Sequence, residues 1–153
     1  MTQLTQNDPA EAVPTSAAGH ILNAMISLTR VSPQHRIIVA GSDSMESYLA
    51  LRRRGFIRVT TPAICRVARA QHTVGLIAGQ SSIRGIQSVL DQIAPFLAAH
   101  AGLALLVGSR ENALKIRTKL EALGFRIEAG VRHTSGLVLS AYRQGYEQMT
   151  KAA

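Results

Sequence analysis

Residues 36–44 read Arg-Ile-Ile-Val-Ala-Gly-Ser-Asp-Ser, and this stretch decides the fold. An uninterrupted apolar run rich in β-branched residues, here Ile37 to Ala40, is typical of a strand that is buried on both faces. Gly41 ends the run, and a helix is expected from about Met45 to Arg54, with Gly55 as its stop. The stretch therefore predicts a buried strand, a tight turn and a helix, which is the repeating unit of a parallel sheet.

The same unit recurs along the chain. Further strands are expected at 56–60, 73–78 and 103–107, and further helices at 16–29, 61–70, 83–97 and 110–123. Pro95 should kink or end the third of these helices, and residues 100–102 (His-Ala-Gly) are expected to form a turn. Two last strands, 125–131 and 137–143, are close enough to form a hairpin. The sequence thus predicts an α/β fold: a mostly parallel, doubly wound sheet of about six strands, with helices on both faces and a C-terminal antiparallel β-hairpin.

The length of 153 residues fits one domain. Residues 1–15 are polar with two prolines and are expected to be a mobile tail, residues 16–143 form the single domain, and residues 144–153 form a polar C-terminal tail. The only cysteine, Cys65, is expected in the middle of a helix as a buried, inert thiol. One cysteine excludes a disulfide framework and a multi-cysteine zinc site, and the five histidines share no metal-ligand spacing.

The chain is basic, with 17 Lys and Arg against 9 Asp and Glu. Fourteen of the 17 cations are Arg, and eight of these fall between Arg30 and Arg69. Such an excess attracts polyanions, so nucleic acid is one candidate partner. A solvated basic face is the simpler interpretation, because no aromatic residues for base stacking alternate with the Arg. Arg52, Arg53 and Arg54 also suit the negative end of the helix expected to finish there.

Targeting and membrane segments are not evident in the sequence. The first cation is Arg30, so the positively charged start of a signal peptide is missing. No apolar run approaches the ~20 residues that span a bilayer. A cytoplasmic location without membrane contact is therefore expected.

A ligand site is expected where the parallel strands end, because ligands of open α/β sheets bind beyond the carboxyl ends of the strands. The residues that follow the expected strands form this rim: Gly41, Ser42, Asp43, Ser44, Thr60, Thr61, Gly79, Gln80, Ser81, Gly108, Ser109 and Arg110. Asp43, the one carboxylate among them, is suited to hold an amino group or to act as a general base. Helix capping is the simpler interpretation of Ser42, Asp43, Ser81 and Ser109. The absence of a GxxxxGK[ST] loop disfavours a P-loop nucleotidase.

The order of elements, from about residue 17 to 143, resembles the class I S-adenosylmethionine-dependent methyltransferase family, whose fold is Rossmann-like. The resemblance is clearest in residues 89–97 (Val-Leu-Asp-Gln-Ile-Ala-Pro-Phe-Leu), in the strand at 103–107, and in residues 120–125 (Leu-Glu-Ala-Leu-Gly-Phe), which are similar to the family's approach to its final hairpin. These are fold-building residues. They imply the family's topology and not its chemistry.

The resemblance implies S-adenosylmethionine as the cofactor and places its site at Gly41, Ser42, Asp43, Ser44, Thr60, Thr61, Gly79 and Gln80. The sequence departs from the family's pattern at three points. Only Gly41 matches the family's Gly-x-Gly-x-Gly turn, and Thr60 and Thr61 stand where the family has an acidic residue for the ribose hydroxyls. The twelve or so residues between Thr60 and Thr73 leave room for one crossover helix, so an extra strand and helix of the family are expected to be missing.

Three functional hypotheses follow. The first is a small S-adenosylmethionine-dependent methyltransferase of unknown substrate, with no assignable catalytic residue and no metal. The second is a non-catalytic methyltransferase-like domain that serves as a binding or partner module through its basic surface. The third is a site for another anionic small molecule at the turn Gly41–Ser44. The resemblance is one of fold, and fold alone does not decide among them.

Overall fold

The structure, a computed structural model, describes residues 17–62, 68–79, 82–108 and 110–143. Its elements in chain order are α2 (Ala17–Thr29), β2 (Ile37–Ala40), α3 (Ser44–Arg53), β3 (Val59–Thr60), β4 (His72–Ile77), α4 (Ile83–Ile93), the 3-10 turn η2 (Ala94–Phe96), β5 (Leu97–Val107), α5 (Arg110–Ala122), β6 (Phe125–His133) and β7 (Gly136–Arg143). They form one six-stranded sheet in the order β3-β2-β4-β5-β7-β6. The four strands from β3 to β5 pair in parallel, and β7 pairs antiparallel with both β5 and β6. The predicted fold class is therefore confirmed.

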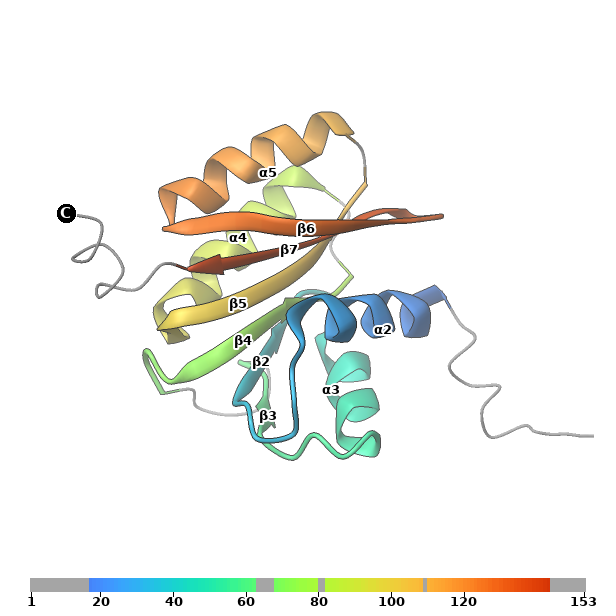
Figure 1. Cartoon of the computed structure of the whole chain (residues 1–153), viewed down its shortest axis with the longest axis vertical. Helices are drawn as coiled ribbons and strands as arrows, with labels where there is room; N and C mark the ends of the chain where they lie inside the picture. Colours follow the sequence, from blue (N-terminus) through green and yellow to red (C-terminus); the bar gives the residue numbers. More distant parts are fainter. Residues whose placement is uncertain (1–16, 63–67, 80–81, 109, 144–153) are drawn as a thin grey trace, which may run out of the picture.

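Strand β2 shows why the sheet carries helices on both faces. All four of its residues are buried, and successive side chains point to opposite sides. Ile38 and Ala40 belong to the apolar cluster beneath α4 and α5, whereas Ile37 and Val39 belong to the cluster beneath α2 and α3. Figure 1 shows these helix pairs on opposite faces of the twisted sheet. The apolar run quoted above is thus the centre of a three-layer sandwich.

The strand expected at 56–60 is shorter than predicted and comprises only Val59–Thr60. The reason is local: the N–H of Phe56 donates to the carbonyl of Leu51 at 3.1 Å, so Phe56 continues the end of α3. Ile57 is 67% exposed and does not join the sheet. Of the helix expected at 61–70, residues 61, 62 and 68–70 are not helical. Residues 63–67, and with them Cys65, lie outside the described residues.

The turn expected at residues 100–102 is wrong, because these residues lie within β5. Pro95 does end α4, as predicted, but the chain enters the strand directly at Leu97. The pairing of β4 with β5 is irregular at this point, since His72 pairs with Leu97 whereas Val74 pairs with Gly102. Arg143 holds the irregular segment by donating to the carbonyls of Ala94, Leu97 and Ala98 at 3.0–3.4 Å. Long-range contacts therefore override a sequence that looks like a turn.

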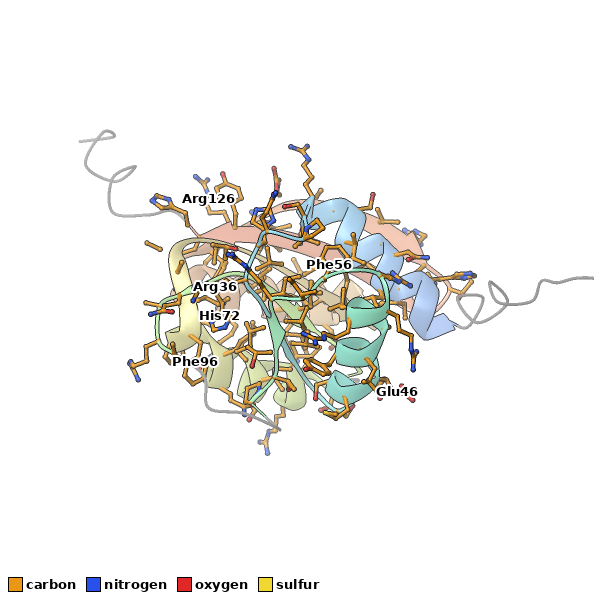
Figure 2. The ribbon with its side chains drawn as sticks, turned by 90° about the horizontal axis from the view of Figure 1, so that it is seen from below. Arg36, Glu46, Phe56, His72, Phe96 and Arg126 are labelled. Atoms are coloured by element: carbon orange, nitrogen blue, oxygen red, sulfur yellow. The ribbon has the colours of Figure 1, made fainter. Side chains whose placement is uncertain are left out.

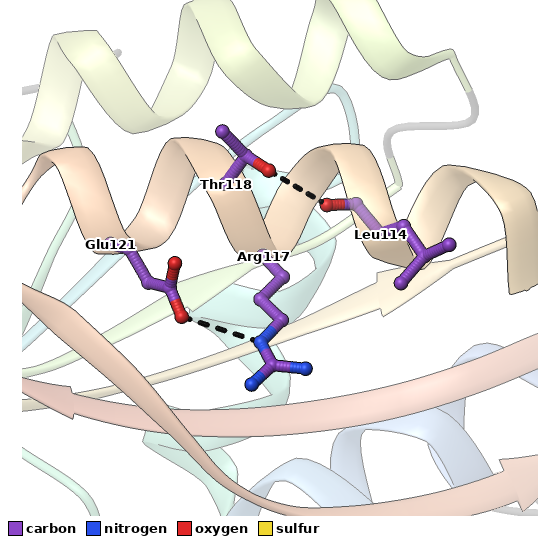
Figure 3. A network of polar contacts seen from close by, with 4 residues as sticks. All are labelled: Leu114, Arg117, Thr118 and Glu121. Atoms are coloured by element: carbon purple, nitrogen blue, oxygen red, sulfur yellow. Dashed lines mark hydrogen bonds and ion pairs between the residues drawn. The ribbon is translucent and has the colours of Figure 1, made fainter.

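Helix α5 follows the expected pattern, with Ile116 and Leu120 fully buried. The i,i+4 pair that the structure shows is Arg117 with Glu121, at 3.3 Å, beside the bond from the Thr118 hydroxyl to the Leu114 carbonyl (Figure 3). The helices α2 and α5, with 13 residues each, are the longest described, and no described helix combines the length and apolarity that a bilayer crossing needs.

The region between β3 and β4 agrees with the expectation of a shortened sheet. β3 is the edge strand, and the described residues between it and β4 contain no further strand. Within the described ranges, the sheet therefore ends one strand after β2. This leaves β2 near one edge, where the chain turns back across the sheet.

Candidate functional site

The carboxyl ends of β2, β3, β4 and β5 meet at one edge of the sheet because these strands are parallel. From β2 the chain passes to β3 on one side, and it then returns to β4 on the other side. This reversal makes the end of β2 the topological switch point, where open α/β sheets bind their ligands. The predicted rim residues Gly41, Thr61 and Gly79 all lie at this edge, as expected.

Gly41 adopts a φ of +109°, a conformation that L residues with side chains rarely adopt. A Cβ atom at this position would also run into the carbonyl oxygen of Ala78, which follows the neighbouring strand β4. The backbone therefore needs glycine here for two independent reasons. The turn after β2 therefore lies in direct backbone contact with the turn after β4.

The two turns are joined by two hydrogen bonds. The N–H of Asp43 donates to the Ala78 carbonyl at 3.1 Å, and the hydroxyl of Ser42 donates to the Gly79 carbonyl at 2.6 Å. Gly79 has a φ of +88°, and a Cβ atom there would lie 2.5 Å from the Asp43 carboxyl carbon. Asp43 therefore stands directly over Gly79. The two turns form one rigid unit at the switch point.

The capping interpretation is wrong for Ser42 and Asp43. Asp43 occupies the position before α3, but its side chain makes no capping hydrogen bond. The hydroxyl of Ser42 is used by Gly79. The N–H of Ser44 donates to the Gly41 carbonyl, and among the described residues no partner accepts from the N–H groups of Met45 and Glu46. The first turn of α3 thus keeps donors that a ligand can use.

The remaining predicted residues are placed as follows. Thr60 ends β3 and is half-buried, and Thr61 follows it with 1% exposure, so both lie beside the end of β2. Gln80, Ser81 and Ser109 lie outside the described residues, and of Arg110 only its position at the start of α5 is described. The residue that caps α4 is Ser82, whose hydroxyl accepts from the N–H of Gly85 at 3.0 Å. The residue predicted to cap this helix, Ser81, is one position too early.

A hollow of about 420 Å³ lies farther along the same edge and was not anticipated. It is lined by the residue that follows β5, Gly108, and by the turn of the β6–β7 hairpin, including Arg132, His133 and Gly136. The ring of His133 makes an edge-on contact with that of His20 on α2, with ring centres 6.5 Å apart. Since β5 lies two strands from β2, the hollow begins about 10 Å from the switch point. The hairpin turn lies there because Leu137 pairs with Val107 and Gly136 lies against the Val107 carbonyl, so sequence spacing could not have shown it.

Several of the clustered Arg are engaged by their own surroundings. Arg36 donates to the Gln71 side chain, Arg52 to the Ile57 carbonyl, Arg54 to Asn23 and Arg58 to the Gln34 carbonyl. These bonds hold exposed loops in place, which agrees with the solvated-face interpretation. Binding of nucleic acid stays a prediction. No group of three or more potential metal ligands occurs within the described ranges.

Comparisons with known proteins identify the fold. No model of a protein family matches the sequence, and no curated protein matches it. Solved structures do match. The ribosomal protein L11 methylase from Lactobacillus delbrueckii subsp. bulgaricus has a TM-score of 0.57 at 12% identity, over 83% of this chain and 79% of that one. The precorrin-6y C5,15-methyltransferase from Geobacter metallireducens has a TM-score of 0.57 at 13% identity, over 83% and 89%. A SAM-dependent O-methyltransferase from Thermotoga maritima has a TM-score of 0.55 at 15% identity, over 80% and 64%.

These matches confirm the resemblance as one of fold: the chain has the architecture of the class I S-adenosylmethionine-dependent methyltransferases. The proteins matched have varied substrates, and this chain spans slightly less than two thirds of the Thermotoga maritima enzyme. At such low identity the likeness shows how the chain folds. What it binds must be argued from the site.

Proposed function

We propose that this chain binds S-adenosylmethionine at the carboxyl edge of its sheet and transfers the methyl group to an acceptor that enters from the hollow beside Gly108. The observation that carries the proposal is the rigid turn at the end of β2. There, Gly41 brings the backbone to the switch point of a methyltransferase fold, and the first turn of α3 offers amide donors.

The turn suits the amino-acid end of the cofactor, which carries an ammonium and a carboxylate. The N–H groups of Met45 and Glu46, at the positive end of α3, suit the carboxylate. The carboxylate of Asp43, for which the described part of the chain shows no hydrogen-bond partner, suits the ammonium. Opposite charges are thus placed within one turn of chain, which favours a zwitterionic ligand over a simple anion.

The ribose would be held differently from the family's usual manner. Thr60 and Thr61 stand at the end of β3, where the family has a carboxylate, and neither side chain carries a charge. A neutral hydrogen bond is about half as strong as one to a charged group. We therefore expect weaker cofactor binding than the family's motif provides, and this is a quantitative consequence of the proposal.

The acceptor would enter from the hollow beside Gly108, where Arg132 and His133 offer polar contacts. S-adenosylmethionine supplies an electrophilic methyl group, so methyl transfer needs little chemistry from side chains. The contribution expected of the chain is to hold donor and acceptor in line, which by itself accelerates such reactions strongly. The substrate class is left open by the geometry.

A thermal-shift titration with S-adenosylmethionine and S-adenosylhomocysteine tests the proposal. A ligand that binds only the folded state adds about 2.7 kcal/mol to the free energy of unfolding at one hundred times its Kd. Asp43→Asn should weaken binding about tenfold through loss of the ammonium contact. Glu121→Gln, on the outer side of α5, is the matched control and should leave binding unchanged.

The absence of any thermal shift would overturn the proposal. If the wild-type chain shows no shift with either compound at millimolar concentration, the glycine turn serves only to join β2 to α3. The chain would then be a methyltransferase fold without the cofactor, and a role as a binding module would take its place.

A further inference from the structure

The opposite edge of the sheet, where the parallel strands begin, holds a second cavity of about 310 Å³. It lies on the face that α2 covers, just beyond the last residues of that helix, Leu28 and Thr29. The strands continue past the end of α2, so part of the sheet surface is left without a helix above it. The volume is at the lower end of the range for small-molecule sites.

Gly102 forms the floor of this cavity, and its presence there has no conformational explanation. It is a strand residue without a positive φ, paired with Val74 on one side and with Tyr142 on the other. A Cβ atom at this position would meet no atom closer than 3.9 Å. A glycine in the interior of a strand often marks a place where another group approaches the backbone closely. Here a Cβ atom would make only ordinary van der Waals contacts, with the carbonyl oxygens of Ala141 and Thr73, and Gly102 lines the cavity.

A buried hydroxyl group at the cavity lacks a partner. Ser140 is 2% exposed and lines the cavity, and its Oγ is the one buried side-chain polar atom without a hydrogen bond among the residues that the structure describes. Leaving such a group unpaired costs about 1–3 kcal/mol. The Oγ is closed to solvent in this structure, so a rotation of the Ser140 side chain must first bring it to the cavity; a ligand that then donates to the hydroxyl would remove this penalty.

A bulge in β6 brings a charge to the same place. In the register of β6 with β7, Ile127 pairs with Ala141 and Ala129 pairs with Ser140, so Glu128 is the extra residue. Bulges re-aim side chains and are frequent beside functional sites. The carboxylate of Glu128 lines the cavity next to Ser140, and it is the one formally charged side chain among the lining residues.

The other lining groups include two histidines, His35 and His100, the end of α2 and Tyr142. The Nδ1 atom of His35 accepts the N–H of Ser32 at 2.8 Å, so the ring carries its proton on Nε2. The last carbonyl groups of α2 contribute the negative end of the helix dipole. Tyr142 adds an aromatic ring, whose face attracts cations. Arg126 lies across from Tyr142 on β6, but it is not among the residues that line the cavity.

From this geometry we propose that the cavity above Gly102 binds a small organic ammonium ion, which pairs with Glu128, donates to Ser140 and rests its apolar part on Gly102 beside Tyr142. The site is separate from the carboxyl edge, and the proposal does not depend on methyl transfer. It also explains why two unfavourable features, an unpaired hydroxyl and an interior strand glycine, occur side by side.

The test is an NMR titration of the ¹⁵N-labelled full chain with n-butylamine, and with butyrate as a probe of the same size and opposite charge. Butylamine should shift the amide signals of Gly102, Ser140 and Tyr142 with a millimolar Kd, and butyrate should not. Glu128→Gln should weaken butylamine binding about tenfold, a loss of about 1.4 kcal/mol. Glu121→Gln, on α5, serves as the matched control and should bind as the wild type does.

Two further variants separate binding from folding. Gly102→Leu should fill the cavity and abolish the shifts, while the remaining amide signals show that the fold is intact. Ser140→Ala keeps the strand and should weaken binding by a smaller factor than Glu128→Gln. The proposal is overturned if butylamine shifts none of the three amides, if butyrate shifts them instead through Arg126, or if Glu128→Gln binds butylamine as tightly as the wild type.

Discussion

The two edges of the sheet use glycine in opposite ways. At the carboxyl edge, Gly41 and Gly79 have positive φ angles, and a Cβ atom on either would strike the other turn. At the amino edge, Gly102 lies in a strand without a positive φ, and a Cβ atom there would touch nothing within 3.9 Å. The backbone at the first edge requires glycine, whereas the backbone at the second edge would accept a Cβ atom without strain. The difference shows that the role of a glycine depends on its φ angle and on the atoms that a Cβ at its position would meet.

The largest expected effect separates the two kinds of glycine. Gly41→Ala should lower the free energy of unfolding by about 3 kcal/mol, because it combines an unfavourable φ with a clash against backbone that cannot move aside. Gly102→Ala should leave the free energy unchanged or raise it by about 0.5–1 kcal/mol, since alanine loses less entropy than glycine in a strand. Urea unfolding followed by circular dichroism measures both.

Equal destabilisation by the two alanine variants would contradict the proposed difference between Gly41 and Gly102. It would mean that the space above Gly102 is needed for packing in the chain itself. A stable Gly41→Ala variant would mean that the turns after β2 and β4 can separate, and that the rigid unit at the switch point does not exist.

The sequence predicted the carboxyl edge better than the amino edge for a physical reason. The structure of residues 37–41 can be predicted from the local sequence, because an apolar run followed by a glycine fits few structures other than a buried strand and a turn. Residues 100–102 have the local pattern of a turn, yet they lie in a strand because β4, β7 and Arg143 hold this segment in the sheet. No local pattern encodes such partners. The bulge at Glu128 and the unpaired hydroxyl of Ser140 depend on register and could not be predicted either.

The predictions for the site residues were likewise correct where they depended on local sequence and wrong where they depended on distant contacts. The position of Gly41 and Thr61 at one edge followed from strand direction alone, which the alternation of strands and helices predicts. The role of Ser42 did not follow, because its partner Gly79 lies 37 residues away. Capping by Ser42 was the natural local expectation, and a long-range hydrogen bond replaced it. Local rules thus found where the site lies but missed how its parts are joined.

The next effect in size concerns the support of the amino edge. Arg143→Met should lower the free energy of unfolding by about 2 kcal/mol, since it leaves three carbonyl groups without their charged donor. It also removes a cation–π contact with Phe125, whose ring centre lies 4.7 Å from the guanidinium carbon. Arg126→Met, an exposed residue on the neighbouring strand, is the control and should change stability by less than about 0.5 kcal/mol. Comparable losses in both variants would show that overall charge matters and that the bonds to the irregular segment do not.

The smallest expected effect is a pH dependence of the free energy of unfolding that arises from His72 at the amino edge. Burial lowers the pKa of His72 below its ordinary value of 6.5, and the charge of Arg36 lowers it further, although the contact of its Nδ1 with the Phe96 carbonyl at 3.2 Å acts in the other direction. Figure 2 shows Arg36, His72 and Phe96 gathered in one region of the molecule. The unfolded chain therefore binds a proton at this residue at a higher pH than the folded chain does. The stability that His72 contributes is complete above about pH 6.5 and is lost as the pH falls through the lowered pKa.

Unfolding free energies measured between about pH 7 and pH 5 should therefore decline more steeply for the wild type than for His72→Gln. Arg36→Gln should give an intermediate slope, because the burial of His72 remains when the nearby positive charge is removed. If the two variants and the wild type share one slope, His72 is not the group that makes the amino edge sensitive to acid. An Arg36→Gln slope as shallow as that of His72→Gln would instead show that the charge of Arg36, and not burial, dominates. That result would make electrostatics the organising feature of this edge, in contrast to the backbone geometry that organises the other.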